Sequence, residues 1–396
     1  MSNNKEQQHI SVLFDIDSAS VAVVVVGYLP SKKLPTHEFF SRRIQLDTHA
    51  SFETFFARTI KTIELLGNEA ARHTPEAIDS IYMSLSVPWM SSQKRKIQYS
   101  KKGEAFLFTK EHAQKLIDKE LSEPLATNLD YHHYDDLNIF ERKTVDIYLN
   151  GYSTLNPFAT KTKVKDVELH SLTSVISKTT QDAFEHAVER VFHRKPTLLS
   201  NTLVQYKALT TFIPNENSAM IIDIGGTNTQ VLVVHDDHLV EIASFPIGRE
   251  HIVEEVMKQA SVSKEKARSL IQLYTHNTLH AEYQQSLQKV MSLAYRVWME
   301  PWFELCDVMS SKKLLPGTFC MTAPDDISDW LRYHILSTDE LMEHTHTSRV
   351  PQIIDMSLFL QSLASDLQVE HLSDSEIIPL ADVVGSMVKE KKSLYE

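Results

Sequence analysis

Residues 219–234 read AMIIDIGGTNTQVLVV, in which two short apolar runs flank an acidic residue, two glycines and a threonine. The runs are rich in β-branched residues, the pattern of a β-hairpin, and we expect Gly225 and Gly226 to supply the positive φ angles of a tight turn. Backbone N–H groups in such a turn can converge on an anion. The stretch therefore predicts a hairpin that holds a phosphate, with Asp223 binding Mg²⁺ through water and Thr227 reaching a phosphoryl oxygen. A plain hairpin without a ligand accounts for the same residues.

A second copy of this pattern lies near the start of the chain. Residues 11–26 read SVLFDIDSASVAVVVV, which repeats the order of apolar strand, Asp-Ile, small-residue turn and apolar strand. Two related hairpins indicate two related halves. Asp15 and Asp223 hold equivalent positions in the two copies, and we expect them to form a pair of acids.

With this duplication the sequence resembles the actin-like ATPase superfamily, in which each of two duplicated domains offers one such hairpin to nucleotide phosphates across a cleft. Within that superfamily, it is most similar to the bacterial branch that contains the cell-division protein FtsA and the type IV pilus assembly protein PilM. Further segments carry this resemblance in the order that the branch shows, namely residues 81–89, 106–113, 146–157, 164–170 and 245–252.

The resemblance implies an α/β protein with the duplicated actin-like (ribonuclease H-like) ATPase fold, two domains around a cleft and an inserted small α+β subdomain. It also implies the boundaries of four parts. These are 1–88 plus 172–212 for the first actin-like domain, 89–171 for the inserted FtsA/PilM-type subdomain, 213–240 plus 310–396 for the second actin-like domain, and 241–309 for a small helical subdomain of the second half.

The same resemblance implies a site for ATP and Mg²⁺ between the two hairpins. Asp15 and Asp223 would be its catalytic acids and would hold the Mg²⁺ ion. The residues that would bind the nucleotide are Asp15, Ser18, Asp223, Gly225, Gly226, Thr227 and Gly248.

Several residues at these nucleotide contacts depart from the family pattern. Asp17 stands where the family has a glycine, which adds a carboxylate beside the phosphates, and Gln230 replaces an aspartate. On the adenosine side, residues 267–271 lack the family's glutamate and lysine, and Pro324 interrupts a glycine turn at residues 322–325. The chain has only 9 glycines among 396 residues, well below the usual fraction of about 7%. We therefore expect ATP binding to be weak or lost.

The composition is that of a globular protein, with 42% hydrophobic and 23% charged residues. A net charge of −12 and basic clusters without interleaved aromatics argue against nucleic acid as a partner. No apolar run approaches the roughly 18 residues of a membrane span, and the polar first residues are not a signal peptide, so we expect a cytoplasmic protein. Cys306 and Cys320 lack paired spacing and are expected to be reduced core residues. The histidines at 132–133 and 344–346 lack the spacing of a metal motif and are expected in solvated loops.

The end of the chain allows two interpretations. From Pro379 onward, apolar side chains fall on one side of a helix that runs into the basic residues 389–392. This is typical of a helix on a membrane surface, as at the end of FtsA, and equally of the final core helix of PilM. We favour the core helix because an apolar stripe is first of all a packing signal. Membrane association would then be indirect, through a partner.

These features predict a cytoplasmic actin-like scaffold that links membrane proteins to a cell-division or pilus-assembly complex. In PilM-like proteins a groove beside the inserted subdomain captures the cytoplasmic tail of a membrane protein, and residues 86–99 and 146–156 are the corresponding region. In FtsA-like proteins this subdomain binds division proteins and the next protomer of a filament. Two alternatives stay open. One is an active Mg-ATP-dependent switch that polymerises, and the other is a small-molecule kinase of the same fold, for which the sequence offers no identifiable carboxylate base.

Overall fold

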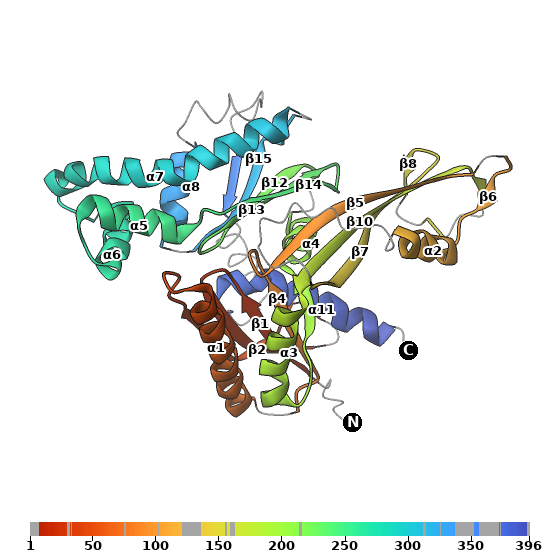
Figure 1. Ribbon diagram of the computed structural model, residues 1–396, viewed down its shortest axis with the longest axis horizontal. Helices are drawn as coiled ribbons and strands as arrows, with labels where there is room; N and C mark the ends of the chain where they lie inside the picture. Colours follow the sequence, from red (N-terminus) through yellow and green to blue (C-terminus); the bar gives the residue numbers. More distant parts are fainter. Residues whose placement is uncertain are drawn as a thin grey trace, which may run out of the picture.

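The computed structural model describes residues 8–29, 32, 34–74, 77–101, 103–120, 136–154, 157–158, 163–213, 216–276, 278–311, 314–324, 326–336, 352–355, 372 and 374–393. Two halves lie one above the other, and an elongated third part extends to one side (Figure 1). The histidines at 132–133 and 344–346, together with Asp325, lie outside the described residues.

The first half is built on a five-stranded sheet of order β11-β4-β1-β2-β3. Its first three strands form an antiparallel meander, and the other two add in parallel to β1. The strands are β1 (His9–Ile16), β2 (Ser20–Tyr28), β3 (His37–Gln45), β4 (Ser80–Leu85) and β11 (Thr197–Ser200). Two helices pack on one face of the sheet, α1 (Phe52–His73) and α3 (Lys178–Phe192).

The second half repeats this topology with a sheet of order β14-β13-β12-β15-β16. Again three antiparallel strands are followed by two parallel ones. The strands are β12 (Ala219–Ile224), β13 (Thr229–His235), β14 (His238–Phe245), β15 (Thr318–Thr322) and β16 (Gln352–Asp355). The predicted duplication is therefore confirmed, with the two quoted hairpins, β1–β2 and β12–β13, in equivalent places.

The central strands are apolar without interruption because both of their faces are covered. In β2, Val23 packs beneath α1 and α3, whereas Val24 belongs to a core shared with the second half. In β12, Ile221 and Ile222 divide in the same way between the shared core and the outer helices of the second half. Each such fully buried side chain stabilises the fold by about 1.5–3 kcal/mol.

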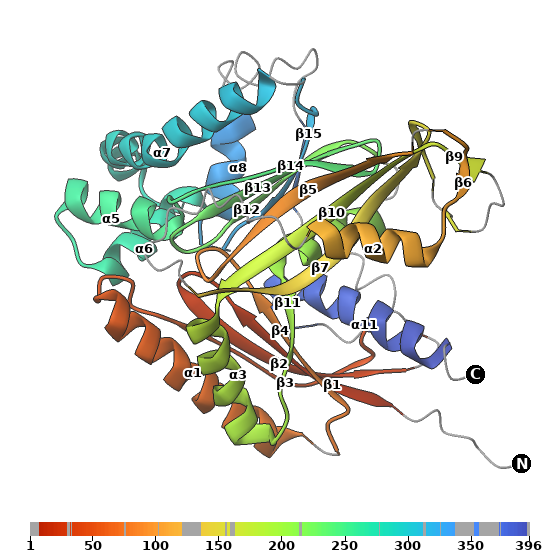
Figure 2. The same ribbon diagram turned by 45° about the vertical axis from the view of Figure 1, so that its right-hand side comes forward.

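The third part is a long sheet of order β5-β10-β7-β8 inserted between β4 and α3 (Figure 2). Its elements are β5 (Met90–Ser100), β6 (Phe106–Leu107), α2 (Lys110–Glu120), β7 (Leu137–Leu149), β8 (Tyr152–Ser153), β9 (Lys163–Val164) and β10 (Asp166–Ser177). The helix covers one face of the sheet around Leu169 and Ala113. The expected turn between β7 and β8 falls at Asn150 and Gly151, which both have positive φ.

Helices cover the outer face of the second sheet. They are α5 (Arg249–Ala260), α6 (Lys264–Thr275), α7 (Ala281–Ser310) and α8 (Ser328–Leu336). Within α7, Trp298 and Trp302 are fully buried and stack with ring centroids 5.6 Å apart. The methionine and aromatic stripe of this helix is therefore core, as predicted. Cys306 and Cys320 are buried and unpaired, which is also as predicted.

Two helices lie between the sheets of the two halves. They are α4 (Asn201–Phe212) and α11 (Ile378–Ser393), the latter preceded by the short 3₁₀ helix η1 (Ser375–Ile377). Leu380 and Val384 of α11 are buried in the shared core, and the Tyr28 hydroxyl donates a hydrogen bond of 2.8 Å to the carbonyl of Ala381. The C-terminal stripe thus packs as a core helix. Among the helices that the structure describes, none is both long and apolar enough to cross a membrane.

Replacing Leu380 with Ala tests this packing. Leu380 is 2% exposed, so we expect the cavity to lower the free energy of unfolding by about 2–5 kcal/mol in urea denaturation. The control is Lys389→Ala, which changes an exposed residue of the same helix and should move stability by no more than about 0.5 kcal/mol. Equal effects of the two substitutions would show that the stripe does not pack in the core.

Candidate functional site

The turns of the two hairpins touch each other at the centre of the molecule. The backbone N–H of Gly226 donates to Oδ2 of Asp17 at 3.2 Å, and that of Thr227 donates to Oγ of Ser18 at 2.8 Å. Four of the predicted nucleotide-binding residues, Ser18, Gly225, Gly226 and Thr227, are therefore brought together. The N–H groups expected to bind a phosphate are engaged by side chains of the other hairpin.

The glycines of the second hairpin serve close approach rather than an unusual backbone conformation. The expectation of positive φ at Gly225 and Gly226 was wrong, because only Gly103 and Gly151 have it among the described glycines. The physical reason is that the turn spans four residues, closed by the Gly225 N–H donating to the Asn228 carbonyl at 2.9 Å. A Cβ on Gly226 would lie 2.1 Å from Cβ of Ala19. Only glycine lets the hairpins come this close.

Gly248, the last predicted nucleotide-binding residue, lies directly behind the turn of the second hairpin. It is the N-cap of α5, and a Cβ there would lie 2.5 Å from the Gly225 carbonyl oxygen. The N–H groups of Arg249 and Glu250 donate to the carbonyls of Gly225 and Gly226 at 3.0 and 2.8 Å. The start of α5 therefore supports the turn and offers these two donors to protein rather than to a ligand.

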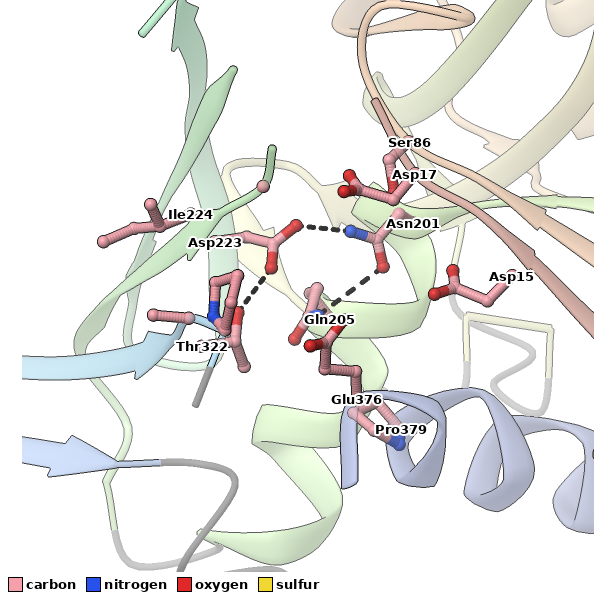
Figure 3. A pocket seen from close by; sticks show the side chains of 13 residues that line it. Asp15, Asp17, Ser86, Asn201, Gln205, Asp223, Ile224, Thr322, Glu376 and Pro379 are labelled. Carbon is pink, nitrogen blue, oxygen red and sulfur yellow. Dashed lines mark hydrogen bonds between the residues drawn. The ribbon is translucent and has the colours of Figure 1, made fainter. Parts of the chain in front are cut away.

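Asp15 and Asp223, the predicted pair of acids, line one small cavity (Figure 3). Asp223 accepts hydrogen bonds from Asn201 at 2.6 Å and from the Thr322 hydroxyl at 2.5 Å. Asp15 forms a 3.0 Å ion pair with Arg43. The cavity has a volume of about 40 Å³, and its other polar lining residues are Asp17, Ser86, Gln205 and Glu376.

Burial places the two acids in an unusual ionisation range. It raises the pKa of Asp15 to about 6, against the opposing charge of Arg43. It raises the pKa of Asp223 to about 7, although the hydrogen bond from Thr322 works in the other direction. Both groups therefore carry protons in the folded protein at pH values where an unfolded chain would have lost them.

Arg43 is a member of this site that the sequence did not reveal. Its guanidinium is 13% exposed and lies 2.8 Å from Asp374 and 3.1 Å from Glu376, in addition to Asp15. Asp374 is 331 residues further along the chain, and no local pattern around either residue signals the pair. This cation joins the edge strand β3 to the segment that precedes α11.

The adenosine side of the cleft is occupied by charge pairs. Arg268 of α6, at the position expected to lack the family's polar contacts, lies 2.9 Å from the buried carboxylate of Glu250. Glu250 also accepts from Arg249 and Lys264. Beside these pairs lies an open depression of about 430 Å³ that reaches Arg43, Gln272 and Pro324.

In this arrangement of the hairpins, the residues present do not fit Mg²⁺-ATP. A cavity of about 40 Å³ holds water molecules rather than a triphosphate, since ligand pockets usually measure about 300–1,000 Å³. Gln230, which replaces the expected aspartate, accepts a hydrogen bond from Thr202 of α4 at 3.2 Å. Within the described ranges, no three His, Cys, Asp or Glu side chains form a group that could hold a metal ion.

The raised pKa values of Asp15 and Asp223 predict how stability depends on pH. Between about pH 5 and pH 8 the folded protein binds more protons than the unfolded chain, so stability should fall as pH rises. We expect the melting temperature to decrease across this range and Asp223→Asn to reduce the decrease. Glu265→Gln, a change of a surface carboxylate, should leave the slope unaltered. A melting temperature that stays level or rises with pH would contradict the prediction.

Removing the Arg43 charge should destabilise the fold strongly. Arg43→Met leaves three carboxylates without their cation, and breaking a buried ion pair from one side costs about 3–5 kcal/mol. The neighbouring Arg42 is 49% exposed and pairs with Glu69 on the surface, so Arg42→Met should cost no more than about 1 kcal/mol. Chemical denaturation of the two variants measures the difference, and similar losses would refute a special role for Arg43.

No protein-family model and no curated protein matches the sequence. Among solved structures, one of a PilM–PilN type IV pilus biogenesis complex has 12% identity and a TM-score of 0.58, over 95% of this chain and 96% of that one. The ethanolamine utilization protein EutJ from Carboxydothermus hydrogenoformans has 11% identity and a TM-score of 0.44, over 89% and 86% of the two chains. The chain thus has the duplicated actin-like ATPase fold with an inserted subdomain, a fold that it shares over nearly its whole length with a PilM structure.

Proposed function

We propose that this protein is a scaffold that captures the cytoplasmic tail of a membrane protein on its inserted sheet and links it to a pilus-assembly or cell-division complex. The observation that carries the proposal is the match to a PilM chain, solved with PilN, which extends over the inserted sheet as well as both halves. Attachment to the cytoplasmic face of a membrane would then come from the captured partner.

The inserted sheet offers an apolar row on which an extended peptide can dock. Tyr99, Val167, Leu149 and Tyr152 lie side by side across its four strands. Residues opposite one another in antiparallel strands share a face, and here that face is the one that α2 partly covers. The row begins in the small core of the subdomain and ends at Tyr152, whose ring is 78% exposed.

Further apolar side chains surround this row at the far end of the subdomain, which stands away from both halves (Figure 1). Leu107 of β6 is 44% exposed, and Phe158 stacks on Phe108 while remaining partly exposed. Peptide-binding grooves use such apolar pockets beside strand edges, and tyrosine is among the residues that dominate binding energy at interfaces. Tyr152 is therefore the side chain that we expect to contribute most.

Nucleotide hydrolysis has no part in the proposed role. The hairpin turns are already in contact, and helix α4 bridges the halves through Asn201–Asp223 and through the Tyr206 hydroxyl, which donates to the Asp237 carbonyl at 2.8 Å. These contacts support a cleft that is held by protein groups alone. ATP binding that is weak or lost is part of the proposal.

Peptides that span the cytoplasmic tails of membrane proteins encoded beside this gene test the proposal. Fluorescence anisotropy should find one that binds, and Tyr152→Ser should weaken its binding at least tenfold, about 1.4 kcal/mol. Val308→Ser is the matched control, because Val308 is 59% exposed on α7 in the second half. Addition of Mg-ATP should not change the affinity. Failure of every peptide to bind, or equal binding by both variants, would refute the capture site.

A further inference from the structure

We infer that Asp17 is a built-in ligand of the anion-binding N–H groups of the second hairpin, and that it keeps the cleft shut by taking the place of a phosphate. The carboxylate comes from the first half and the N–H groups come from the second. The contact is therefore an internal lock between the halves. It stands on the geometry of the cleft and is independent of tail capture by the inserted sheet.

The carboxylate lies against the second turn with both of its oxygens. Oδ2 accepts from the Gly226 N–H at 3.2 Å, and Oδ1 would be 2.7 Å from a Cβ on Gly225. A carboxylate is an oxyanion, as a phosphate is, and backbone N–H groups in a turn bind either one. Ser18 adds a neutral acceptor for the next N–H, that of Thr227.

The first turn presents Asp17 in a fixed position. Its N–H donates to the Ser20 carbonyl at 3.0 Å, and its carbonyl accepts from the indole N–H of Trp89 at 2.9 Å. Trp89 is itself buried and stacks on Phe55 with ring centroids 5.5 Å apart. Because the turn is held before the halves meet, little entropy is lost when the contact forms.

Charge on the opposite side of the cleft favours the same closed arrangement. Arg249 is buried in the second half, and the charge of Asp17 raises its pKa further. Its guanidinium also donates to Oε1 of Gln45 in the first half at 2.7 Å. Thus three hydrogen bonds cross the cleft at this level, from Gly226, Thr227 and Arg249.

An outside phosphate must displace Asp17 before it can reach these donors. A group in the same chain competes at a high effective concentration, commonly millimolar or above for short connections. The neighbouring Asp15 and Asp223 would also oppose an arriving anion wherever they are ionised. The closed scaffold is then the ground state of the protein, and removal of the Asp17 charge should uncover an oxyanion site.

Binding of inorganic pyrophosphate and of Mg-ATP to the full chain, measured by calorimetry, tests the lock. We expect no heat for the wild type at millimolar ligand, and binding at least tenfold tighter for Asp17→Asn and for Asp17→Gly. The asparagine variant keeps the size of the side chain and guards against misfolding of the glycine variant. Glu376→Gln is the control, since Glu376 lines the same cavity but is no acceptor for the Gly226 or Thr227 N–H.

A second measurement follows the distance between the halves. Spin labels on cysteines placed at the exposed Lys61 of α1 and Lys266 of α6 report on the cleft, while the native Cys306 and Cys320 are buried. Gly226→Ala puts a methyl group 2.1 Å from that of Ala19 and should lengthen or broaden the distance distribution. Gly317→Ala adds the same group where no atom lies within 4 Å and should not.

The outcomes separate the lock from its competitors. Tight pyrophosphate binding by the wild type, or equal gains in Asp17→Asn and Glu376→Gln, would overturn it, the latter by revealing a general charge effect. Folded Asp17 variants that stay silent would overturn it too, as would an unchanged distance in Gly226→Ala. None of these results bears on tail capture, which the Tyr152 variant tests separately.

Discussion

The hydrogen bonds from Gly226 and Thr227 to the turn of the first hairpin are the contact on which the rest of the structure depends. They need two conditions at once: glycine in one turn, so that backbones can approach, and an acceptor in the other. An actin-like cleft normally leaves space between such turns for phosphates. Here the acceptor is a side chain, so the two halves meet directly and the remaining cavity is the size of a few water molecules.

The helices between the sheets make this contact part of a larger core. α4 belongs in sequence to the first half but reaches the second through Asn201, Thr202 and Tyr206, and α11 packs with it against both sheets. The start of α4 is also tied to the inserted sheet, because its N-cap Ser200 donates to the buried carboxylate of Glu141 on β7. One helix thus touches all three parts, which couples the inserted sheet to the cleft.

A charged cluster forms a second connection between the inserted sheet and the second half. Asp146 of β7 is 3% exposed and accepts from His238 of β14, with His170 and Lys94 close by on the inserted sheet. Hydrogen bonds from both histidines help to hold the pKa of this carboxyl below its usual value, even though burial acts to raise it. Together with Leu172 and Leu239 of the shared core, this cluster holds the sheet in one orientation, which a docking surface requires.

The sequence by itself determined the local elements of this protein. Alternation of apolar residues, with Asp-Ile and small residues between, predicted both hairpins because strand pairing and turn chemistry act over a few residues. Their repetition, with the family resemblance, led to the duplicated fold, and the departures at Asp17 and Gln230 marked the altered cleft. Only the tertiary structure decided what those departures do, since Asp17 meets its donor 209 residues away and Arg43 meets Asp374 331 residues away. Such contacts depend on how two sheets pack, and packing is set by the whole core rather than by any local pattern. For the same reason the glycines of the second turn were expected for their φ angles, whereas the folded chain uses them to let the two halves touch.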